Sequence, residues 1–315
     1  MPSSSPVRGQ LAILKRTWDE FNADDCMQQA AALAYYTAFS LPPLLLLLLM
    51  IAGMVWDPAD VRGTIEGQIS TFMGPAGASQ VRSILANAEQ PGTGGVVATI
   101  VSVGALIFGA TGAFVQLQSA LNRAWEVKPD PRQGGVRNFV LKRLFSFGMV
   151  LAIAFLLVVS LVLSAALSAF GEMLGRMLPE GFSATLLQVI NFGISLVVFT
   201  AVFATMFKVL PDAVVGWRDT IVGALATTLL FVIGRFIISF YLGRSDPGDA
   251  FGAAGSLAII LVWIYYSSII LMMGAEYTQA WAEGHGRRIE PEPGAVRVVV
   301  QEKHVEAKPA EEGKG

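Results

Sequence analysis

Long runs of apolar residues recur along the chain and alternate with shorter polar segments. The clearest run lies near the carboxyl end, where the 25 residues from Phe251 to Ala275 contain no charged side chain. Because a helix rises about 1.5 Å per residue, such a run crosses a bilayer core of roughly 30 Å. Six runs of this kind predict six transmembrane helices, at residues 30–56, 96–121, 144–170, 184–207, 220–242 and 252–280.

Other segments show helical periodicity or strong polarity without spanning a membrane. Residues 9–25 place charged side chains opposite an apolar face formed by Leu11, Leu14, Trp18 and Phe21. This pattern predicts an amphipathic helix in the plane of the lipid headgroups. The first loop, residues 57–95, carries two apolar stripes that predict short helices, either a packed cap or a gate. Residues 1–8 and 284–315 have compositions that favour disorder.

The composition is that of a polytopic all-α membrane protein. Of the 315 residues 54% are hydrophobic and 15% are charged, and the mean hydropathy is +0.58. Soluble domains carry about 25% charged residues. The single cysteine, Cys26, excludes an intramolecular disulfide and a Cys-based zinc site. Both histidines lie in or beside the polar tail, where solvated side chains are expected rather than metal ligands. The tail shows no nucleic-acid-binding module, so we expect no metal, no cofactor and no binding of nucleic acid.

The distribution of Lys and Arg predicts the orientation in the membrane. Seventeen of these residues lie in the amino-terminal segment, the second and fourth loops and the tail, against four in the other loops. Because cytoplasmic loops carry an excess of Lys and Arg, both termini are expected in the cytoplasm. Six polar residues are then expected near the cytoplasmic face, namely Glu276, Asn122, Arg123, Lys208, Asp212 and Arg218. Arg235 falls in the outer half of the fifth span.

Two ionisable residues within or beside the predicted spans are candidates for function. Glu276 follows the apolar run of the last span, and Arg235 interrupts the fifth. A charged group at membrane depth needs a partner or water, and it often marks a pathway. For Glu276 the alternatives are a structural pair with a basic group and a coupling or gating role. For Arg235 they are snorkelling outward, a structural ion pair, and binding of an anionic substrate.

The first span carries a further set of candidates. Pro42 and Pro43 lie in its middle, where their rings and missing N–H groups should kink or break the helix. Such a kink is either structural or part of a cavity. Tyr35 and Tyr36 either line the mouth of a route or belong to the aromatic belt at the interface. We group both tyrosines with Glu276, Arg235, Asn122, Arg123 and Asp212 as candidate translocation or gating residues.

Four segments carry a family resemblance: AAALAYYTAFSLPPLLLLLL, GATGAFVQLQSALNRAWEV, LPDAVVGWRDTIVGA and FGAAGSLAIILVWIYYSSIILMMGAEYTQAWAE. Together they resemble the YihY/virulence factor BrkB family, and they cover residues 18–283. The resemblance implies a six-span bacterial inner-membrane protein linked to serum resistance and envelope lipid traffic. The family also carries an older label, ribonuclease BN. Metal-dependent phosphodiester hydrolysis needs clustered His and carboxylate ligands, which neither histidine has nearby, so we interpret that label as a misannotation.

These observations favour a transporter or a translocator of lipid or another amphiphile. Its partners would be membrane lipids and an amphipathic or anionic substrate. The chain lacks the G-x-x-x-x-G-K-[ST] motif, so active transport would depend on an ion or on a partner protein. The alternative is a membrane scaffold that transports nothing. We expect no enzymatic activity, and a ribonuclease is the least favoured function.

Overall fold

The computed structural model describes residues 6–52, 112–133, 182–245 and 255–298, together with isolated positions between 57 and 83. The third predicted span, residues 144–170, lies outside the described residues, as does most of the second. In the first loop the described positions from Ala59 to Ser83 are helical, and Arg82 forms an ion pair with Glu66 at 2.7 Å.

The described part of the chain is mostly helical. Its labelled helices are α1 (Pro6–Ala23), α2 (Cys26–Ala52), α6 (Phe182–Val209), α7 (Trp217–Ser245) and α9 (Gly255–Gly284), and a further helix covers residues 112–124. Four of these coincide, within a few residues at each end, with predicted spans. Among the described residues, three segments are long and apolar enough to cross a membrane: Phe192–Val209, Trp217–Ile238 and Leu257–Gly284.

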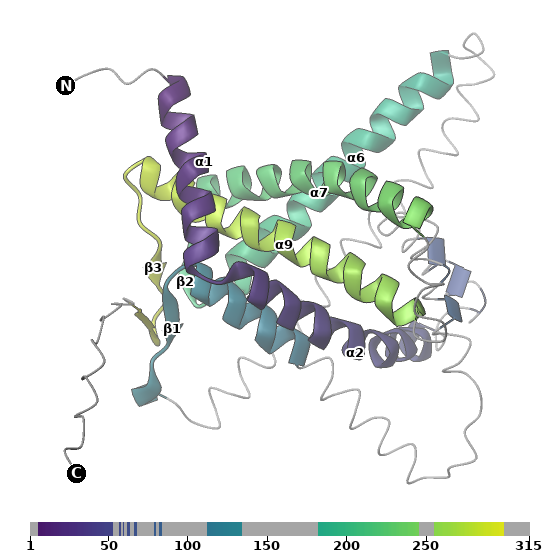
Figure 1. Ribbon diagram of the computed structural model, residues 1–315, viewed down its shortest axis with the longest axis horizontal. Coiled ribbons are helices and arrows are strands. Elements are labelled where there is room, and N and C mark those ends of the chain that lie inside the picture. The colour runs from purple at the N-terminus through teal and green to yellow at the C-terminus, as the bar shows by residue number, and fades with distance from the viewer. Residues whose placement is uncertain are drawn as a thin grey trace, which may run out of the picture.

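Helix α9 is the central element, because α7, α2 and α1 all pack against it (Figure 1). Its approach to α7 is closest at two matched glycines. An added Cβ on Gly223 would lie 1.8 Å from Thr278 Oγ1, and one on Gly274 would lie 1.9 Å from Thr227 Oγ1. The two antiparallel helices thus share a reciprocal Gly-x-x-x-Thr contact, the kind of small-residue seam that lets membrane helices approach closely.

Helices α1 and α2 are joined by a turn of two residues. Asp25 has a φ of 51°, a left-handed conformation that Asp tolerates better than most residues. Its carbonyl then accepts hydrogen bonds from the backbone N–H groups of Gln28 and Gln29, which start α2. Helix α2 continues through Pro42 and Pro43, so the predicted break does not occur there. A kink stays a prediction.

Helix α1 lies across the end of the bundle, whereas α2, α7 and α9 run beside one another (Figure 1). Its packing face consists of Ile13, Thr17 and Phe21, all buried, because a spacing of four residues keeps them on one side. Three apolar residues of the predicted stripe, Leu11, Leu14 and Trp18, are exposed. Phe21 therefore belongs to the packing face, and α1 presents a second, apolar face outward.

The chain beyond α9 was expected to be disordered, and for residues 284–298 this is wrong. Strand β3 (Glu290–Pro291) pairs antiparallel with β2 (Ala213–Val214), and β4 (Ala295–Arg297) pairs antiparallel with β1 (Val127–Pro129). A short 3₁₀ helix, Pro131–Gln133, follows β1. We call residues 285–298 the carboxyl-terminal strap, because they cross the end of the bundle from α9 to β1.

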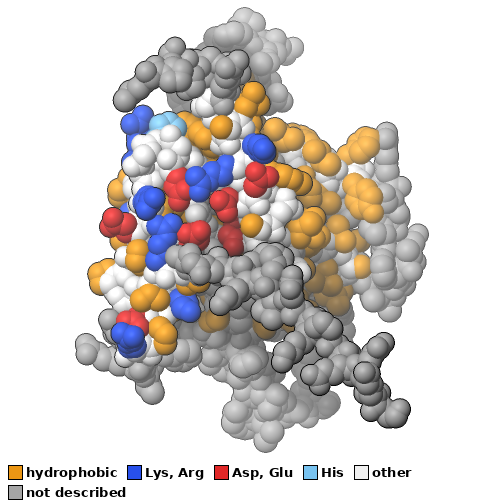
Figure 2. All heavy atoms as spheres, turned by 60° about the vertical axis from the view of Figure 1, so that its left-hand side comes forward, with side chains coloured by type: hydrophobic (Ala, Val, Ile, Leu, Met, Phe, Trp, Pro, Cys, Tyr) orange, Lys and Arg blue, Asp and Glu red, His pale blue; other side chains and the backbone are white. Residues whose placement is uncertain are grey.

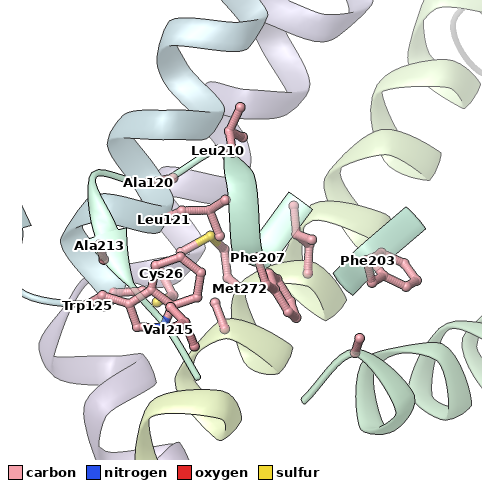
Figure 3. Close-up of a cluster of buried hydrophobic side chains, with 14 of the residues drawn as sticks. Cys26, Ala120, Leu121, Trp125, Phe203, Phe207, Leu210, Ala213, Val215 and Met272 are labelled. Atoms are coloured by element: carbon pink, nitrogen blue, oxygen red, sulfur yellow. The ribbon is translucent and has the colours of Figure 1, made fainter. Parts of the chain in front are cut away.

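The core lies beneath this strap. Trp125 and Phe207 meet edge to face with their ring centroids 5.9 Å apart, and Cys26, Val215 and Met272 lie around them (Figure 3). These residues come from the turn after helix 112–124, from α6, from the start of α2, from the β2–α7 connection and from α9. Packing of these five parts of the chain fixes the geometry of the polar groups at this end.

Candidate functional site

Charged side chains gather at the end of the bundle formed by α1, the α1–α2 turn and the strap. Figure 2 shows the described Lys, Arg, Asp and Glu side chains over this end, with hydrophobic side chains covering the flank beside it. Such a division separates a surface suited to water from a surface suited to lipid. The candidate site lies inside the polar end.

Glu276 is the most deeply buried carboxylate among the described residues, with no exposed surface. The thiol of Cys26 donates a hydrogen bond to its Oε1 at 3.3 Å. Its Oε2 is also buried and has no hydrogen-bond partner within the part of the chain that the structure describes. The structural alternative predicted a basic partner for Glu276, but the partner found is a thiol.

Several carboxyl groups surround the end of the bundle in which Glu276 is buried. Asp24, Glu20 and Glu126 are the carboxylates that act on it electrostatically. The nearby guanidinium of Arg123 is engaged elsewhere, since it pairs with Asp25 at 2.8 Å and with Asp24 at 3.8 Å. The positive charge of Arg123 is therefore placed at the outer edge of the site, over the α1–α2 turn.

Asp24 is a half-buried carboxyl group at the edge of the site. Its burial raises its pKa from 3.8 to about 6, although the positive charge of Arg123 opposes the rise. The folded protein therefore holds this proton more tightly than the unfolded chain does. The favourable contribution to stability is fully present below pH 3.8 and is lost as the pH rises through about 6.

Asp24→Asn is accordingly expected to flatten the pH dependence of stability between pH 4 and about 6, the window set by its ordinary and shifted pKa. The measurement is the melting temperature of the purified protein in detergent across this range. Asp19→Asn, on the exposed side of α1, is the matched control and should keep the wild-type slope. Equal slopes in wild type and Asp24→Asn would contradict the assignment.

Asn122 and Asp212 form a reciprocal pair. The Asn122 amide Nδ2 donates to Asp212 Oδ2 at 2.9 Å, and the backbone N–H of Asp212 donates to Asn122 Oδ1 at 2.8 Å. Gln118 adds a longer hydrogen bond to Asp212 Oδ1 at 3.4 Å. The pair connects the helix over residues 112–124 to the turn between α6 and α7. Two candidates that lie 90 residues apart in sequence thus meet in the fold.

The strap is anchored on this same turn and on α7. Arg287 donates to both carboxylate oxygens of Asp219, with Nε 2.9 Å from Oδ2 and Nη2 2.6 Å from Oδ1. The backbone N–H of Glu292 donates to the carbonyl of Asp212 at 3.0 Å. The first half of the strap therefore closes over the α6–α7 turn.

The second half of the strap is anchored beside Trp125. Arg297 donates to Glu126 Oε2 at 2.7 Å, and the backbone N–H of Val298 donates to the Glu126 carbonyl at 2.7 Å. Glu126 has a φ of 52°, which turns the chain from helix 112–124 into β1. The strap thus covers the end of the bundle in which Glu276 is buried.

The remaining candidates lie away from Glu276. Tyr35 and Tyr36 are exposed on α2, and the ring of Tyr35 lies 4.8 Å from that of Phe39, also exposed. This placement favours the aromatic belt over the mouth of a route. Arg235 is half-buried on α7, with its guanidinium 5.5 Å from the Phe236 ring. Near this level α7 meets α9 at Ile270 and Tyr266, rather than at Glu276.

Sequence reasoning identified Glu276 but missed its surroundings. Cys26 was treated only as a lone thiol, and neither Asp24 nor the pair of Arg287 and Asp219 was singled out. The available signal was the run Asp24-Asp25-Cys26, where two charges stand directly before a charge-free stretch. Nothing local connects that run with a glutamate 250 residues away.

Long apolar helices, polar groups gathered at one end and a carboxylate buried between helices define a helical membrane protein. The sequence profile of the family described as "Virulence factor BrkB" matches residues 17–298. The chain belongs to the virulence factor BrkB family, which confirms the resemblance found in its sequence motifs.

Relatives of the chain are bacterial proteins named as membrane proteins or as ribonuclease-like. YfkH of Bacillus subtilis, named a ribonuclease-like protein, is 27% identical over 274 residues, which cover 84% of this chain and 94% of YfkH. A UPF0761 membrane protein of Alcanivorax borkumensis is 24% identical, and the match covers 89% of this chain but 63% of that relative. Another, of Pseudoalteromonas atlantica, is 26% identical with 81% of each chain covered. No solved structure matches the chain.

The word ribonuclease-like belongs to the name of the Bacillus subtilis protein. In this chain, the described residues contain no group of three or more His, Cys, Asp or Glu side chains placed to hold a metal ion. The recurrent description among the relatives is membrane protein, in agreement with the long apolar helices.

Proposed function

We propose that this protein is a six-span translocator of an amphipathic, anionic substrate in the bacterial inner membrane, with both termini in the cytoplasm. The observation that carries the proposal is Glu276, a carboxylate buried between membrane helices with one oxygen unpartnered among the described residues. Ionisable groups in such positions are costly, and in membrane proteins they mark substrate and ion pathways.

The orientation is supported by charge and by the position of the terminal segments. The 17 to 4 asymmetry of Lys and Arg favours cytoplasmic termini. Helix α1 and the strap lie at the same end of the bundle, as expected for an even number of spans (Figure 1). The exposed Leu11, Leu14 and Trp18 give α1 an apolar face suited to lie among lipid headgroups.

The substrate class is inferred from Arg235 and from the apolar side chains beside it on α7. Arg235 lies in the outer half of α7 and supplies a cationic group for an anionic headgroup. The exposed apolar side chains of α7 at and beyond this level, including Ile233, Phe236 and Phe240, are compatible with an acyl chain beside it. An amphiphile with a negative headgroup fits both features.

The test is reconstitution of the purified full-length protein in liposomes, with scrambling of a fluorescent anionic phospholipid and leakage of a trapped solute measured together. We expect lipid movement with wild type and its loss or strong reduction in Glu276→Gln and in Arg235→Ala. Glu290→Gln and Arg218→Ala are the matched controls, because both side chains are exposed at the polar end. Both controls should move lipid at the wild-type rate.

The same experiment separates the translocator from a scaffold. A monodisperse, folded wild-type protein that moves neither lipid nor solute would contradict the proposal and favour the scaffold. Lipid movement that is equal in wild type, Glu276→Gln and Arg235→Ala would leave translocation standing and remove both residues from the route.

A further inference from the structure

We propose that Glu276 is a proton-binding site, and that the proton is the ion that drives this translocator. The juxtaposition that carries the inference is a fully buried carboxylate whose partner is a thiol and whose charged neighbours are mostly acids. Its role as coupling ion rests on the proposed function, whereas the proton site itself does not.

A buried carboxylate without a cationic partner is strongly disfavoured as an anion, because its solvation in water is lost. Cys26 donates a single weak hydrogen bond to Oε1, and Oε2 has none within the described residues. A proton on Oε2 removes the charge, so the neutral acid is the form that this environment accommodates.

Acidic side chains come from several of the elements packed around Glu276. Helix α1 contributes Glu20, the α1–α2 turn contributes Asp24 and Asp25, and α2 contributes Cys26. The turn after helix 112–124 contributes Glu126, which is paired with Arg297, whereas Arg123 of that helix is paired with Asp24 and Asp25.

Within the part of the chain that the structure describes, the other elements packed on α9 add no free positive charge to this set. Helix α7 faces α9 with Gly223 and Thr227, and its Asp219 is paired with Arg287 of the strap. On α9 itself, Tyr277 is the adjacent titratable residue, and Glu283 forms ion pairs with Arg16 and Arg297.

The surroundings of Glu276 suit a proton better than an anion or a divalent cation. An anion would find no positive partner at Glu276 within the described residues, because Arg123 and Arg297 are already paired with carboxylates. A divalent cation prefers several oxygen or nitrogen ligands, and no group of three suitable side chains exists among the described residues. A proton needs one carboxyl oxygen only.

Asp24 connects the site with the surface, because its charge acts on Glu276 and it lies half-buried beside the exposed Arg123. Burial places its pKa at about 6, so it exchanges protons with cytoplasmic water near neutral pH. When the site opens, the bond between Oε2 and its proton breaks and the Asp24 carboxylate receives the proton. The reverse transfer reloads Glu276.

The test is infrared spectroscopy of the full-length protein in lipid nanodiscs, where a protonated carboxyl absorbs apart from carboxylates. At pH 7 we expect a protonated-carboxyl band in wild type that is missing in Glu276→Gln, because exposed carboxyl groups are ionised at this pH. Glu283→Gln, an ion-paired glutamate of the same helix, should retain the band. A band that is missing in wild type, or unchanged in Glu276→Gln, would overturn the inference.

A second variant keeps the test decisive if Glu276→Gln does not fold. Cys26→Ser replaces the thiol by a stronger donor to Oε1 and should therefore shift the frequency of the band while keeping its intensity. An unshifted band in folded Cys26→Ser would assign it to another residue and contradict the proposal.

The outcomes also separate this inference from the proposed function. A Glu276 band in a protein that moves no lipid would leave the proton site standing and remove translocation. Lipid movement could also occur without a Glu276 band and without any effect of a pH difference across the liposome membrane. That result would support translocation and contradict both proton binding at Glu276 and coupling to protons. With both correct, a pH difference changes the rate in wild type and not in Glu276→Gln.

Discussion

Gly274→Ala is expected to lower the free energy of unfolding by about 1 to 3 kcal/mol, the usual cost of inserting a methyl group into a packed contact. The added Cβ would lie 1.9 Å from Thr227 Oγ1 and 2.8 Å from Thr227 Cβ, so α7 and α9 must move apart. The measurement is SDS-induced unfolding in mixed micelles, followed by circular dichroism. Gly223→Ala should behave similarly, since its Cβ would lie 1.8 Å from Thr278 Oγ1.

Gly193→Ala on α6 is the matched control for this contact. Its added Cβ would meet no atom within 4 Å, so the same substitution should not lower stability, and the higher helix propensity of Ala favours a gain of up to about 1 kcal/mol. Adding Thr227→Ala to Gly274→Ala removes the nearest atom and should recover part of the loss, giving a measurable coupling between the two sites. Equal effects of Gly274→Ala and Gly193→Ala would show that α7 and α9 do not approach as described.

Asn122→Ala is expected to cost about 1.5 to 3 kcal/mol, because hydrogen bonds to charged groups are worth this much and the Asp212 carboxylate is buried. The variant removes the donor to Asp212 Oδ2 and the acceptor for the Asp212 backbone N–H. The same unfolding assay measures it. The midpoint of unfolding should move to a lower SDS concentration, because the contact between helix 112–124 and the α6–α7 turn is weakened.

Asn22→Ala provides the control, because Asn22 also donates a hydrogen bond, but at an exposed position on α1. Its effect should stay below about 0.5 kcal/mol. Asn122→Asp adds a test by pH, because it places two carboxylates side by side. They repel at neutral pH, so the loss of stability in this variant should become smaller on acidification. A loss in Asn122→Ala no larger than that in Asn22→Ala would contradict the structural role of the pair.

The positions of the helices were predictable from local pattern, and their contacts were not. Apolar runs predicted α2, α6, α7 and α9 within a few residues, because a run long enough to cross lipid has to satisfy its backbone as a helix. The face that each helix buries depends on its neighbours. On α1 the stripe chosen from periodicity contained Leu11 and Trp18, whereas the packing face against α9 is built on Ile13 and Thr17.

The carboxyl-terminal strap is ordered by partners that are distant in the sequence, which its composition does not reveal. Strands β3 and β4 have two and three residues, too few for an alternating pattern, and the segment is rich in Pro and Glu. Their order comes from partners far away in the chain, β2 and β1, and from ion pairs such as Arg287 with Asp219. Low hydrophobicity predicts disorder only when no such partner exists.

The sequence by itself determined that this is a helical membrane protein of the BrkB family, where the described helices α2, α6, α7 and α9 lie, and that Glu276 is an ionisable residue at the end of an apolar run. These are local properties, since hydropathy and periodicity are written in consecutive residues. Only the tertiary structure decided that Glu276 meets the thiol of Cys26 across 250 residues, that Arg123 is paired with aspartates, and that the strap closes this end. The physical reason is that the groups packed around a buried carboxyl group decide whether it is charged or neutral, and helix packing determines which groups those are.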